Sequence, residues 1–333
     1  MTIARLTLQD FTAFRSADLS FASGVNVFIG ANATGKTHVM KVLYATLKAA
    51  APQLSTAELD VRIKEKLARV FRPDDLAIGR LGHRRRGQRS AKVSIVDVGG
   101  EEIAYSVYSR TSSLKLSVST MKDPPSCIFL PSREALAMYE GFAHAYQERE
   151  LSFDETYYDL ALSLSAGAVR GAKPAIADIL AELEGAIGGK VVLEGGRFYV
   201  NGIEAHLLSE GMRKLASIVR LLANNELREK GVLFWDEPEA NLNPALSVVV
   251  ARVLARLAAQ GIQVFVATHD YLVSETLAML DPGRGQGDMR FFSFLRDESG
   301  AVSVASADEL DDLEPNLIRE EFLRHYDRVR GLG

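Results

Sequence analysis

Cysteine is nearly absent from this sequence, which has one, Cys127, among 333 residues. A single thiol excludes an internal disulfide, and its place in the apolar run 127–130 predicts a small buried side chain. Uncharged apolar runs long enough to span a membrane are also missing, and the first residues lack the apolar core of a signal peptide. We therefore expect a soluble, cytoplasmic protein.

An excess of positive charge is missing as well, because 39 Lys and Arg residues face 43 Asp and Glu residues, for a net charge of −4. Any surface for nucleic acid must therefore be local. One candidate is the stretch 80–92, which holds six basic side chains and no acid. A solvated charge run and a loop that contacts a DNA backbone are both open interpretations. The six residues are Arg80, Arg84, Arg85, Arg86, Arg89 and Lys92.

The residues that are present include a complete phosphate-binding pattern at 30–37, which reads Gly, four residues, then Gly-Lys-Thr. The apolar stretch 25–29 before it predicts a buried strand, and apolar residues at helical spacing follow it. In this context the loop N–H groups and the helix N-terminus favour phosphate. We expect Lys36 to reach the β- and γ-phosphates of ATP, and the Thr37 hydroxyl to bind Mg²⁺. The loop consists of Gly30, Ala31, Asn32, Ala33, Thr34, Gly35, Lys36 and Thr37.

Two acids, Asp236 and Glu237, follow an apolar strand predicted at 231–235. An acid at the carboxyl end of a buried strand can hold Mg²⁺, and the next acid can polarise the attacking water, so we assign these roles in that order. A solvated turn is the alternative interpretation. A further strand is predicted at 262–266, and His269 after it is placed to bind the γ-phosphate or the water. Lys36, Glu237 and His269 are thus the predicted catalytic residues.

The segment 207–213 resembles the signature motif of ABC-type ATPases, Leu-Ser-Gly-Gly-Gln, with Glu210 and Met212 as departures. In that motif a serine hydroxyl and a glycine backbone at a helix N-terminus bind the γ-phosphate held by the other subunit. The two residues that this role needs are present as Ser209 and Gly211. For the segment taken alone, an ordinary serine helix cap is the alternative.

The order of P-loop, signature-like segment, paired acids and histidine resembles the ABC-type ATPases of the SMC, RecF and OLD group, particularly its short bacterial AAA-family members. The resemblance covers residues 3–47 and 207–280. It implies an ATP-dependent homodimer in which each site is completed by the partner's Ser209 and Gly211. Segment 239–243 would lie at the dimer interface. The group's roles in DNA repair and phage defence imply DNA, or a separate effector protein, as a partner.

Three departures from the group's pattern restrict what the resemblance implies. No glutamine follows a strand as the group's Q-loop glutamine does, and Ser132 or Glu134 holds the equivalent place. Asn243 replaces the aspartate of the D-loop. Too few residues follow His269 for the Toprim nuclease domain of the fused branch, so effector chemistry would belong to another polypeptide.

These patterns predict an α/β fold, a P-loop NTPase of the ABC-ATPase type with a mixed central sheet, an antiparallel β-subdomain and an α-helical insertion. Residues 1–130 would form the N-terminal lobe, 131–189 the insertion and 190–333 the C-terminal lobe. A hairpin of 190–193 with 198–200 is expected to return the chain to the main sheet. A helix is expected from 214 to 227. Further strands are predicted at 3–11, 14–21, 93–98, 103–108, 114–118 and 128–130. Further helices are predicted at 56–71 and 243–259, and three more are predicted between 135 and 187.

The function that fits these features best is a molecular switch that dimerises on ATP, hydrolyses it and controls DNA engagement or an effector. A nucleotide-binding subunit of an ABC transporter is one alternative, but the missing Q-loop glutamine argues against it. A P-loop kinase for a small molecule would need no signature segment. An ATP-dependent scaffold without catalysis is the last alternative, and the intact Lys36, Asp236 and Glu237 argue against it.

Overall fold

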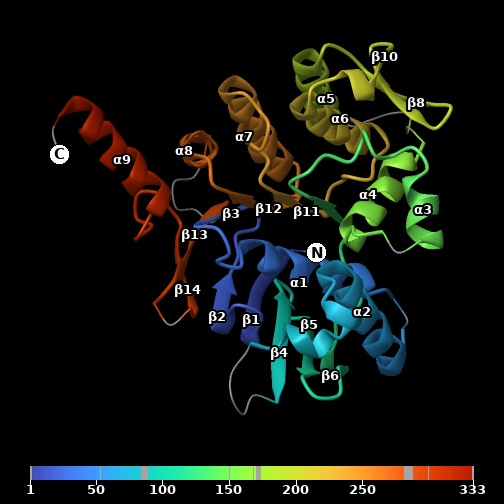
Figure 1. The fold of residues 1–333 in the computed structure, drawn as a ribbon, viewed down its shortest axis with the longest axis vertical. Helices are drawn as coiled ribbons and strands as arrows, with labels where there is room; N and C mark the ends of the chain where they lie inside the picture. Colours follow the sequence, from blue (N-terminus) through green and yellow to red (C-terminus); the bar gives the residue numbers. More distant parts are fainter. Residues whose placement is uncertain are drawn as a thin grey trace.

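A computed structural model of the protein describes residues 2–52, 54–83, 89–149, 151–167, 169, 174–280, 288–298 and 300–331. Three of the predicted basic residues, Arg84, Arg85 and Arg86, lie outside this described part. The described chain is organised around a six-stranded sheet, with helices over one face and a helix backed by a second sheet over the other (Figure 1). None of the described helices is long and apolar enough to cross a bilayer.

The six-stranded sheet has the strand order β14-β13-β3-β12-β11-β7. Its strands are parallel except for β14, which pairs antiparallel with β13. The central strands β3 and β12 are buried along their whole length, as expected for parallel strands covered on both faces. The parallel pairing brings the carboxyl ends of β3, β12 and β11 to one edge of the sheet. The strands are β3 (Val25–Gly30), β7 (Cys127–Leu130), β11 (Val232–Asp236), β12 (Gln263–Thr268), β13 (Met289–Arg296) and β14 (Val302–Ala307).

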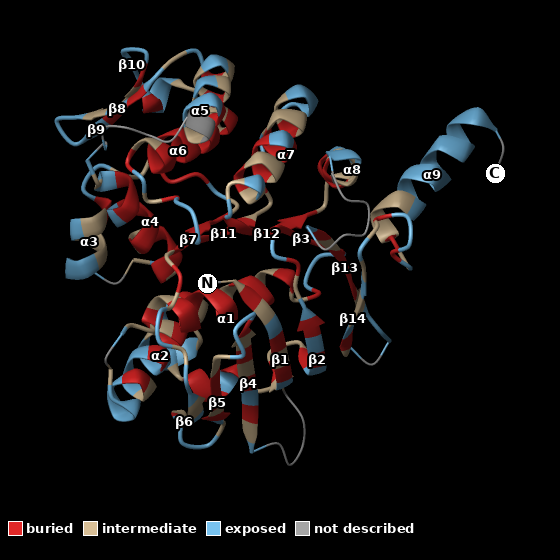
Figure 2. Cartoon of the chain, turned by 180° about the vertical axis from the view of Figure 1, so that it is seen from behind, coloured by how far each residue is buried: buried red, intermediate tan, exposed pale blue. Residues whose placement is uncertain are grey.

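Helices cover both faces of this sheet. On one face lie α6 (Glu210–Ala223), α7 (Pro244–Ala259) and α8 (Tyr271–Leu280), and on the other lies α1 (Lys36–Ala49) (Figure 1). Figure 2 shows that the buried residues concentrate along the sheet and α1, whereas α9 (Leu317–Arg330) is exposed and extends away from the body. Cys127 is buried in β7, as predicted.

A five-stranded antiparallel sheet packs under α1, in the order β2-β1-β4-β5-β6. The strands predicted at 3–11 and 14–21 and the predicted meander are confirmed, and the pairing of β1 with β4 joins them into one sheet. The helix predicted at 56–71 is confirmed as α2, which begins with a capping box at Ser55 and Glu58. The strands are β1 (Ile3–Phe11), β2 (Phe14–Ser20), β4 (Ser90–Asp97), β5 (Glu102–Tyr108) and β6 (Ser113–Ser119), and α2 is Thr56–Phe71.

Between β7 and α6 the described chain contains the three predicted helices. Aromatic side chains of the first two, α3 and α4, pack on one another. The predicted hairpin is confirmed, but its return to the main sheet is wrong, because it forms a separate three-stranded sheet with β10. Exposed residues interrupt β8, unlike the continuously buried central strands. The division of the chain into two lobes and an insertion stays a prediction. The elements are α3 (Phe142–Glu148), α4 (Glu155–Ser165), α5 (Pro174–Ile187), β8 (Val191–Glu194), β9 (Arg197–Val200) and β10 (Ile203–Glu204).

The boundaries predicted for the helix at 214–227 are also wrong, because α6 begins at Glu210 and ends at Ala223. Ser209 caps its first turn, and Asn225, with a φ of 60°, turns the chain away just after its end. Short 3-10 turns complete the described elements, namely η1 (Asp74–Leu76), η2 (Ile78–Leu81) and η3 (Ala205–Leu207).

One buried side chain, that of Gln263 at the start of β12, links the two large sheets. Its Nε2 donates to the carbonyls of Ile3 and Ala22, both at 2.8 Å, and its Oε1 accepts from Ile3 N at 2.8 Å. Ile3 opens β1 of the antiparallel sheet. All three contacts are with backbone groups that have to be satisfied once they are buried.

We expect Gln263→Leu to lower the free energy of unfolding by about 3 kcal/mol, because it leaves buried backbone groups without partners. Urea unfolding followed by circular dichroism measures this. The exposed Gln9 on β1 provides the matched control, and Gln9→Leu should change stability by less than about 0.5 kcal/mol. Equal effects of the two substitutions would mean that Gln263 is not a structural link.

Candidate functional site

The predicted P-loop connects the carboxyl end of β3 to the first residue of α1. Two of its glycines are required by space. A Cβ on Gly30 would lie 2.5 Å from the carbonyl oxygen of Phe294, and one on Gly35 would lie 2.7 Å from the ring of Phe14. Among the described residues no side chain caps α1, so the N–H groups of its first turn remain for a ligand. Such a helix start favours an anion.

Lys36 lies folded over this loop with 5% of its surface exposed. Its Nζ donates to the carbonyls of Gly30 at 2.8 Å and Ala31 at 3.0 Å. Burial lowers its pKa to about 8, while the carboxylates of Asp236 and Glu237 act in the opposite direction. The ammonium therefore stays mostly charged at pH 7, next to the space that a phosphate would fill.

Thr37, in the first turn of α1, contacts Asp236, the last residue of β11. The Thr37 hydroxyl donates to the Asp236 carboxylate, with 3.0 and 3.1 Å to its two oxygens. Burial raises the pKa of Asp236 to about 6. A hydroxyl and a carboxylate at one edge of the sheet are the oxygen donors that Mg²⁺ prefers, so these residues fit the metal.

Glu237 and His269 face each other beside this pair, at the ends of β11 and β12. His269 Nε2 lies 3.6 Å from Glu237 Oε1. Burial lowers the pKa of His269, and the charge of Lys36 lowers it further, so the ring is neutral at pH 7. The Glu237 side chain is 40% exposed and therefore accessible to water.

A pocket of about 770 Å³ opens over these groups. It brings together the predicted residues 32–37 with Asp236, Glu237 and His269. A second part of its wall comes from outside the predicted nucleotide site, from the first turn of α1, the end of α2, the surroundings of the antiparallel sheet and the β13–β14 hairpin. These wall residues are Thr12, Ala13, His38, Phe71, Pro73, Asp74, Arg80, Leu81, Gly82, His83, Arg296 and Gly300.

The two signature residues are not part of the described wall of this pocket. Ser209 is exposed at the start of α6, where its Oγ accepts from Met212 N at 3.4 Å. Gly211 packs against segment 239–243, because a Cβ there would lie 2.6 Å from the Asn241 carbonyl oxygen. Within one chain these residues therefore do not meet the P-loop, and their role at a partner's nucleotide stays a prediction.

Glu239, in the segment expected at a dimer interface, makes a contact within its own chain, and the role of the segment at an interface stays a prediction. Its Oε1 accepts from the backbone N of His269 at 2.8 Å, and its Oε2 is buried. Burial raises its pKa. The side chain thus faces inward and holds the residue after β12, whereas the neighbouring Asn241 and Asn243 are exposed. Sequence reasoning missed this contact because Glu239 and His269 belong to different strand–loop units.

Glu134, one of two residues in the place of the Q-loop glutamine, is tied to the signature helix. Its Oε1 accepts from Arg213 Nε at 2.7 Å, and its Oε2 accepts from Ala137 N at 3.1 Å. Arg213 also donates to the carbonyl of Leu208. The carboxylate is buried in these contacts. It therefore links the end of β7 to α6.

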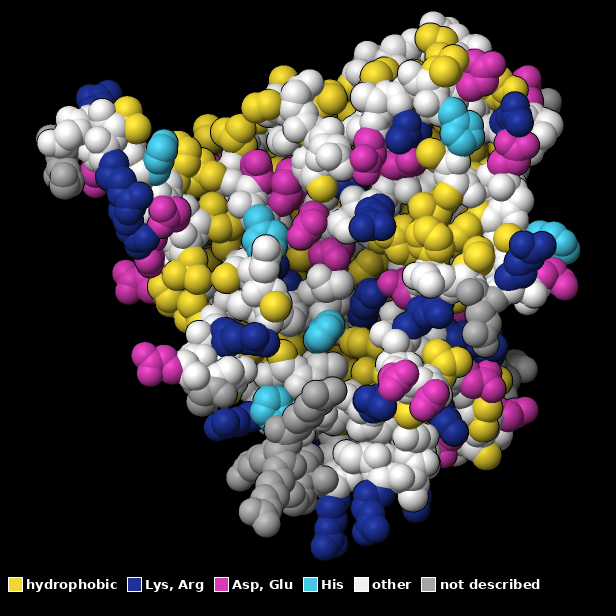
Figure 3. All heavy atoms as spheres, in the orientation of Figure 1, with side chains coloured by type: hydrophobic (Ala, Val, Ile, Leu, Met, Phe, Trp, Pro, Cys, Tyr) yellow, Lys and Arg dark blue, Asp and Glu magenta, His cyan; other side chains and the backbone are white. Residues whose placement is uncertain are grey.

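The basic stretch at 80–92 is described only at its two ends. Arg80 lines the pocket over the P-loop and pairs with Asp74 at 2.7 Å. Arg89 and Lys92 are exposed at the start of β4. Figure 3 shows Lys and Arg side chains projecting from the end of the antiparallel sheet that carries β4, β5 and β6.

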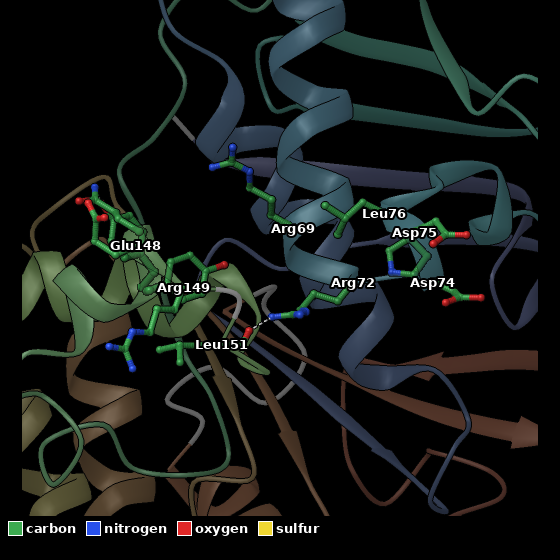
Figure 4. Close-up of a pocket in the computed structure, with 12 residues that line it drawn as sticks. Arg69, Arg72, Asp74, Asp75, Leu76, Glu148, Arg149 and Leu151 are labelled. Atoms are coloured by element: carbon green, nitrogen blue, oxygen red, sulfur yellow. Dashed lines mark hydrogen bonds between the residues drawn. The ribbon is translucent and has the colours of Figure 1, made fainter.

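Another pocket, of about 870 Å³, lies between the end of α2 and the helices α3 and α4. Figure 4 shows Arg69 and Arg72 on one side of it, and Glu148, Arg149 and Leu151 on the other. Arg72 donates to the Leu151 carbonyl across this space. Acids and arginines both line it, and the P-loop does not, so it lacks the features of a phosphate site.

Comparisons with known proteins find sequence similarity in parts of this chain. Residues 190–275 match the family described as "AAA domain, putative AbiEii toxin, Type IV TA system". The DNA replication and repair protein RecF of Streptococcus suis (strain 05ZYH33) is 30% identical over 99 residues, which are 30% of this chain and 25% of the relative. RecF of Herpetosiphon aurantiacus is 50% identical over 44 residues, 13% of this chain and 11% of the relative. These matches thus span a quarter or less of each relative's length.

Two solved structures of SMC head domains share the fold at low sequence identity. An SMC head bound to the C-winged helix domain of ScpA has a TM-score of 0.57 at 16% identity, covering 93% of this chain and 98% of that chain. An SMC head with an extended coiled coil, bound to the C-terminal domain of ScpA derived from Pyrococcus furiosus, has a TM-score of 0.54 at 14% identity, covering 99% of both. The predicted fold class is confirmed.

Proposed function

We propose that this chain is an ATP-hydrolysing switch that closes into a homodimer when ATP binds. The proposal starts from the premise that the chain is an ABC-type ATPase of the SMC and RecF group. The observation that carries the proposal is the convergence of Lys36, the Thr37–Asp236 pair and Glu237 on one pocket. These residues come from two segments of the chain that are about 200 residues apart. Together they supply the charge, the metal donors and the base that phosphoryl transfer to water needs.

Each residue has a definite task in this proposal. Lys36 would exchange the carbonyls of Gly30 and Ala31 for phosphate oxygens, which are stronger acceptors because they are charged. Thr37 and Asp236 would hold Mg²⁺, which neutralises charge on the phosphates. Glu237 would take the proton of the attacking water.

A second copy of the chain would complete the site. Ser209 is exposed at a helix N-terminus, outside the described wall of its own subunit's pocket. In a two-fold symmetric dimer, each Ser209 and Gly211 would face the partner's γ-phosphate. ATP would then act as part of the interface, and its hydrolysis would reopen the dimer.

The output of the switch would be engagement of DNA or control of a separate effector protein. RecF relatives support DNA, and the toxin–antitoxin family description supports an effector. Arg80, Arg89 and Lys92, together with Arg84, Arg85 and Arg86, are the candidate DNA contacts. A transporter subunit is less well supported, because Glu134 is engaged by Arg213. A small-molecule kinase is less well supported because Glu237 is accessible to water.

The proposed function is tested by Mg²⁺-dependent release of phosphate from ATP. We expect Lys36→Met to weaken ATP binding by at least about a hundred-fold, because it removes a charge-assisted contact with the phosphates from a largely buried site. The exposed Lys92 is the matched control, and Lys92→Met should bind ATP as the wild type does. Hydrolysis is measured with and without duplex DNA. A wild-type protein that releases no phosphate under either condition would refute the proposal.

A further inference from the structure

Lys214 of α6 is a buried cation whose contacts are backbone carbonyls. It has 4% of its surface exposed. Its Nζ donates to the carbonyl of Glu237 at 2.8 Å and to that of Ala240 at 3.2 Å. Burying an ammonium costs free energy unless it has hydrogen-bond partners. The two carbonyls are therefore needed by the buried Lys214 side chain at this position. It stands on the helix that Ser209 caps.

The carbonyls that Lys214 holds belong to the turn that follows β11. Glu237 has a φ of 47°, a left-handed conformation that is disfavoured for a residue with a side chain. Ala240 N donates back to the Glu237 carbonyl at 3.1 Å, and Leu242 N donates to the Glu239 carbonyl at 2.9 Å. The Glu237 carbonyl therefore accepts from both the turn and Lys214. Charge-assisted contacts of this kind stabilise a conformation that the backbone alone disfavours.

A second contact also joins α6 to the turn that follows β11. Gly211, one helical turn before Lys214, packs so closely that an added Cβ would lie 2.6 Å from the Asn241 carbonyl oxygen and 2.8 Å from Leu242 Cδ2. The helix is thus joined to the turn by close packing at Gly211 and by hydrogen bonds at Lys214. We expect α6 and the turn 237–242 to move as one unit.

The charges around Lys214 are consistent with this placement. Burial lowers the pKa of Lys214 to about 8, and the carboxylates of Glu239, Glu210, Glu237 and Asp236 act against that shift. The side chain therefore remains mostly protonated at pH 7, with its N–H groups available to both carbonyls.

We propose that Lys214 is a positioning residue for ATP hydrolysis, which fixes the turn that presents the Glu237 carboxylate and ties it to the signature helix. This inference rests on the proposed function. In the dimer, Ser209 at the start of α6 would touch the partner's nucleotide, while Glu237 would serve the nucleotide of its own subunit. Lys214 would then link formation of one site to the geometry of the other.

The test compares Lys214→Met with Arg220→Met. Arg220 lies on the same helix, is 6% exposed and donates to the carbonyls of Leu164 at 3.0 Å and Ala166 at 2.6 Å, away from the pocket. We expect Lys214→Met to lower kcat by about a hundred-fold, with KM for ATP changed by less than about three-fold, because the base is misplaced while the P-loop is intact. Lys214→Arg should recover part of kcat. Arg220→Met should keep kcat near the wild-type value.

Amide hydrogen exchange in nucleotide-free protein gives a readout that does not depend on activity. Lys214→Met should speed exchange at Ala240 and Leu242 by about ten-fold or more, whereas Arg220→Met should not. Should Lys214→Met fail to fold, Lys214→Gln is measured in its place with the same expectation. Unchanged exchange at both amides, or an equal loss of kcat in both methionine variants, would overturn the role of Lys214. A wild-type protein without hydrolysis would refute the proposed function, and exchange would still decide whether Lys214 holds the turn.

Discussion

Glu237→Gln is expected to lower ATP hydrolysis by about a thousand-fold while ATP stays bound, because the amide cannot take a proton from water. The substitution keeps the size of the side chain and leaves in place Lys36, proposed to contact the phosphates, and Thr37 and Asp236, proposed to hold Mg²⁺. It also removes one negative charge near the γ-phosphate. The closed, ATP-bound dimer should therefore accumulate. Phosphate release and the mass of the protein in solution, with and without ATP, measure the two effects.

The matched control for this substitution is Glu204→Gln, at an exposed glutamate of β10 that is not part of the described wall of the pocket. It should leave both phosphate release and mass unchanged. A Glu237→Gln variant that hydrolyses ATP at the wild-type rate would exclude Glu237 as the base. A variant that binds ATP but stays monomeric at every concentration would instead exclude the ATP-dependent dimer.

Ser209→Asp is expected to abolish ATP-dependent dimerisation and to lower hydrolysis by at least about a hundred-fold, because it directs a carboxylate at the partner's γ-phosphate. Aspartate is as good a helix cap as serine, so α6 should keep its stability. ATP binding to the monomer should change by less than about three-fold. Ser209→Asn, which also caps a helix but carries no charge, is the control. Calorimetry with ATP and mass in solution separate binding from dimerisation.

A mixture of the two inactive variants tests whether the site is shared. In a mixed dimer of Ser209→Asp with Lys36→Met, one site combines an intact P-loop with an intact signature, and the other site combines both substitutions. If the subunits mix freely and the sites act independently, the mixture should regain about a quarter of wild-type hydrolysis, by the two-fold symmetry of the dimer. No recovery at concentrations where the wild type dimerises would contradict a shared site.

The arrangement of the candidate nucleotide site was largely predictable from the sequence because its parts are local. The P-loop pattern carries its own strand and helix, and the acids directly follow an apolar run, so each part is readable in a short window. Parallel strands then align their carboxyl ends, which is why Thr37 and Asp236 lie within 3.1 Å although they are far apart in the chain. Their roles in catalysis stay predictions.

The contacts that support the site could not be predicted in this way. The sequence pattern does not distinguish Lys214 from the other residues of its predicted helix. It also does not distinguish Glu239 from the other acids that follow the predicted strand. What each side chain does depends on which loop packs beside it. The hairpin at 191–200 was misplaced for a related reason, since its local pattern predicts pairing within the hairpin and says nothing of which sheet lies next to it.

By itself, the sequence determined the fold class and most of the strands and helices, and it predicted which residues would handle phosphate, metal and water. Motif spacing and hydrophobic periodicity are properties of a few neighbouring residues. Only the tertiary structure decided that Glu239 faces inward, that Glu134 holds Arg213, and that Lys214 holds the turn after β11. These are hydrogen bonds between distant segments, and their partners are fixed by packing that no short stretch of sequence encodes.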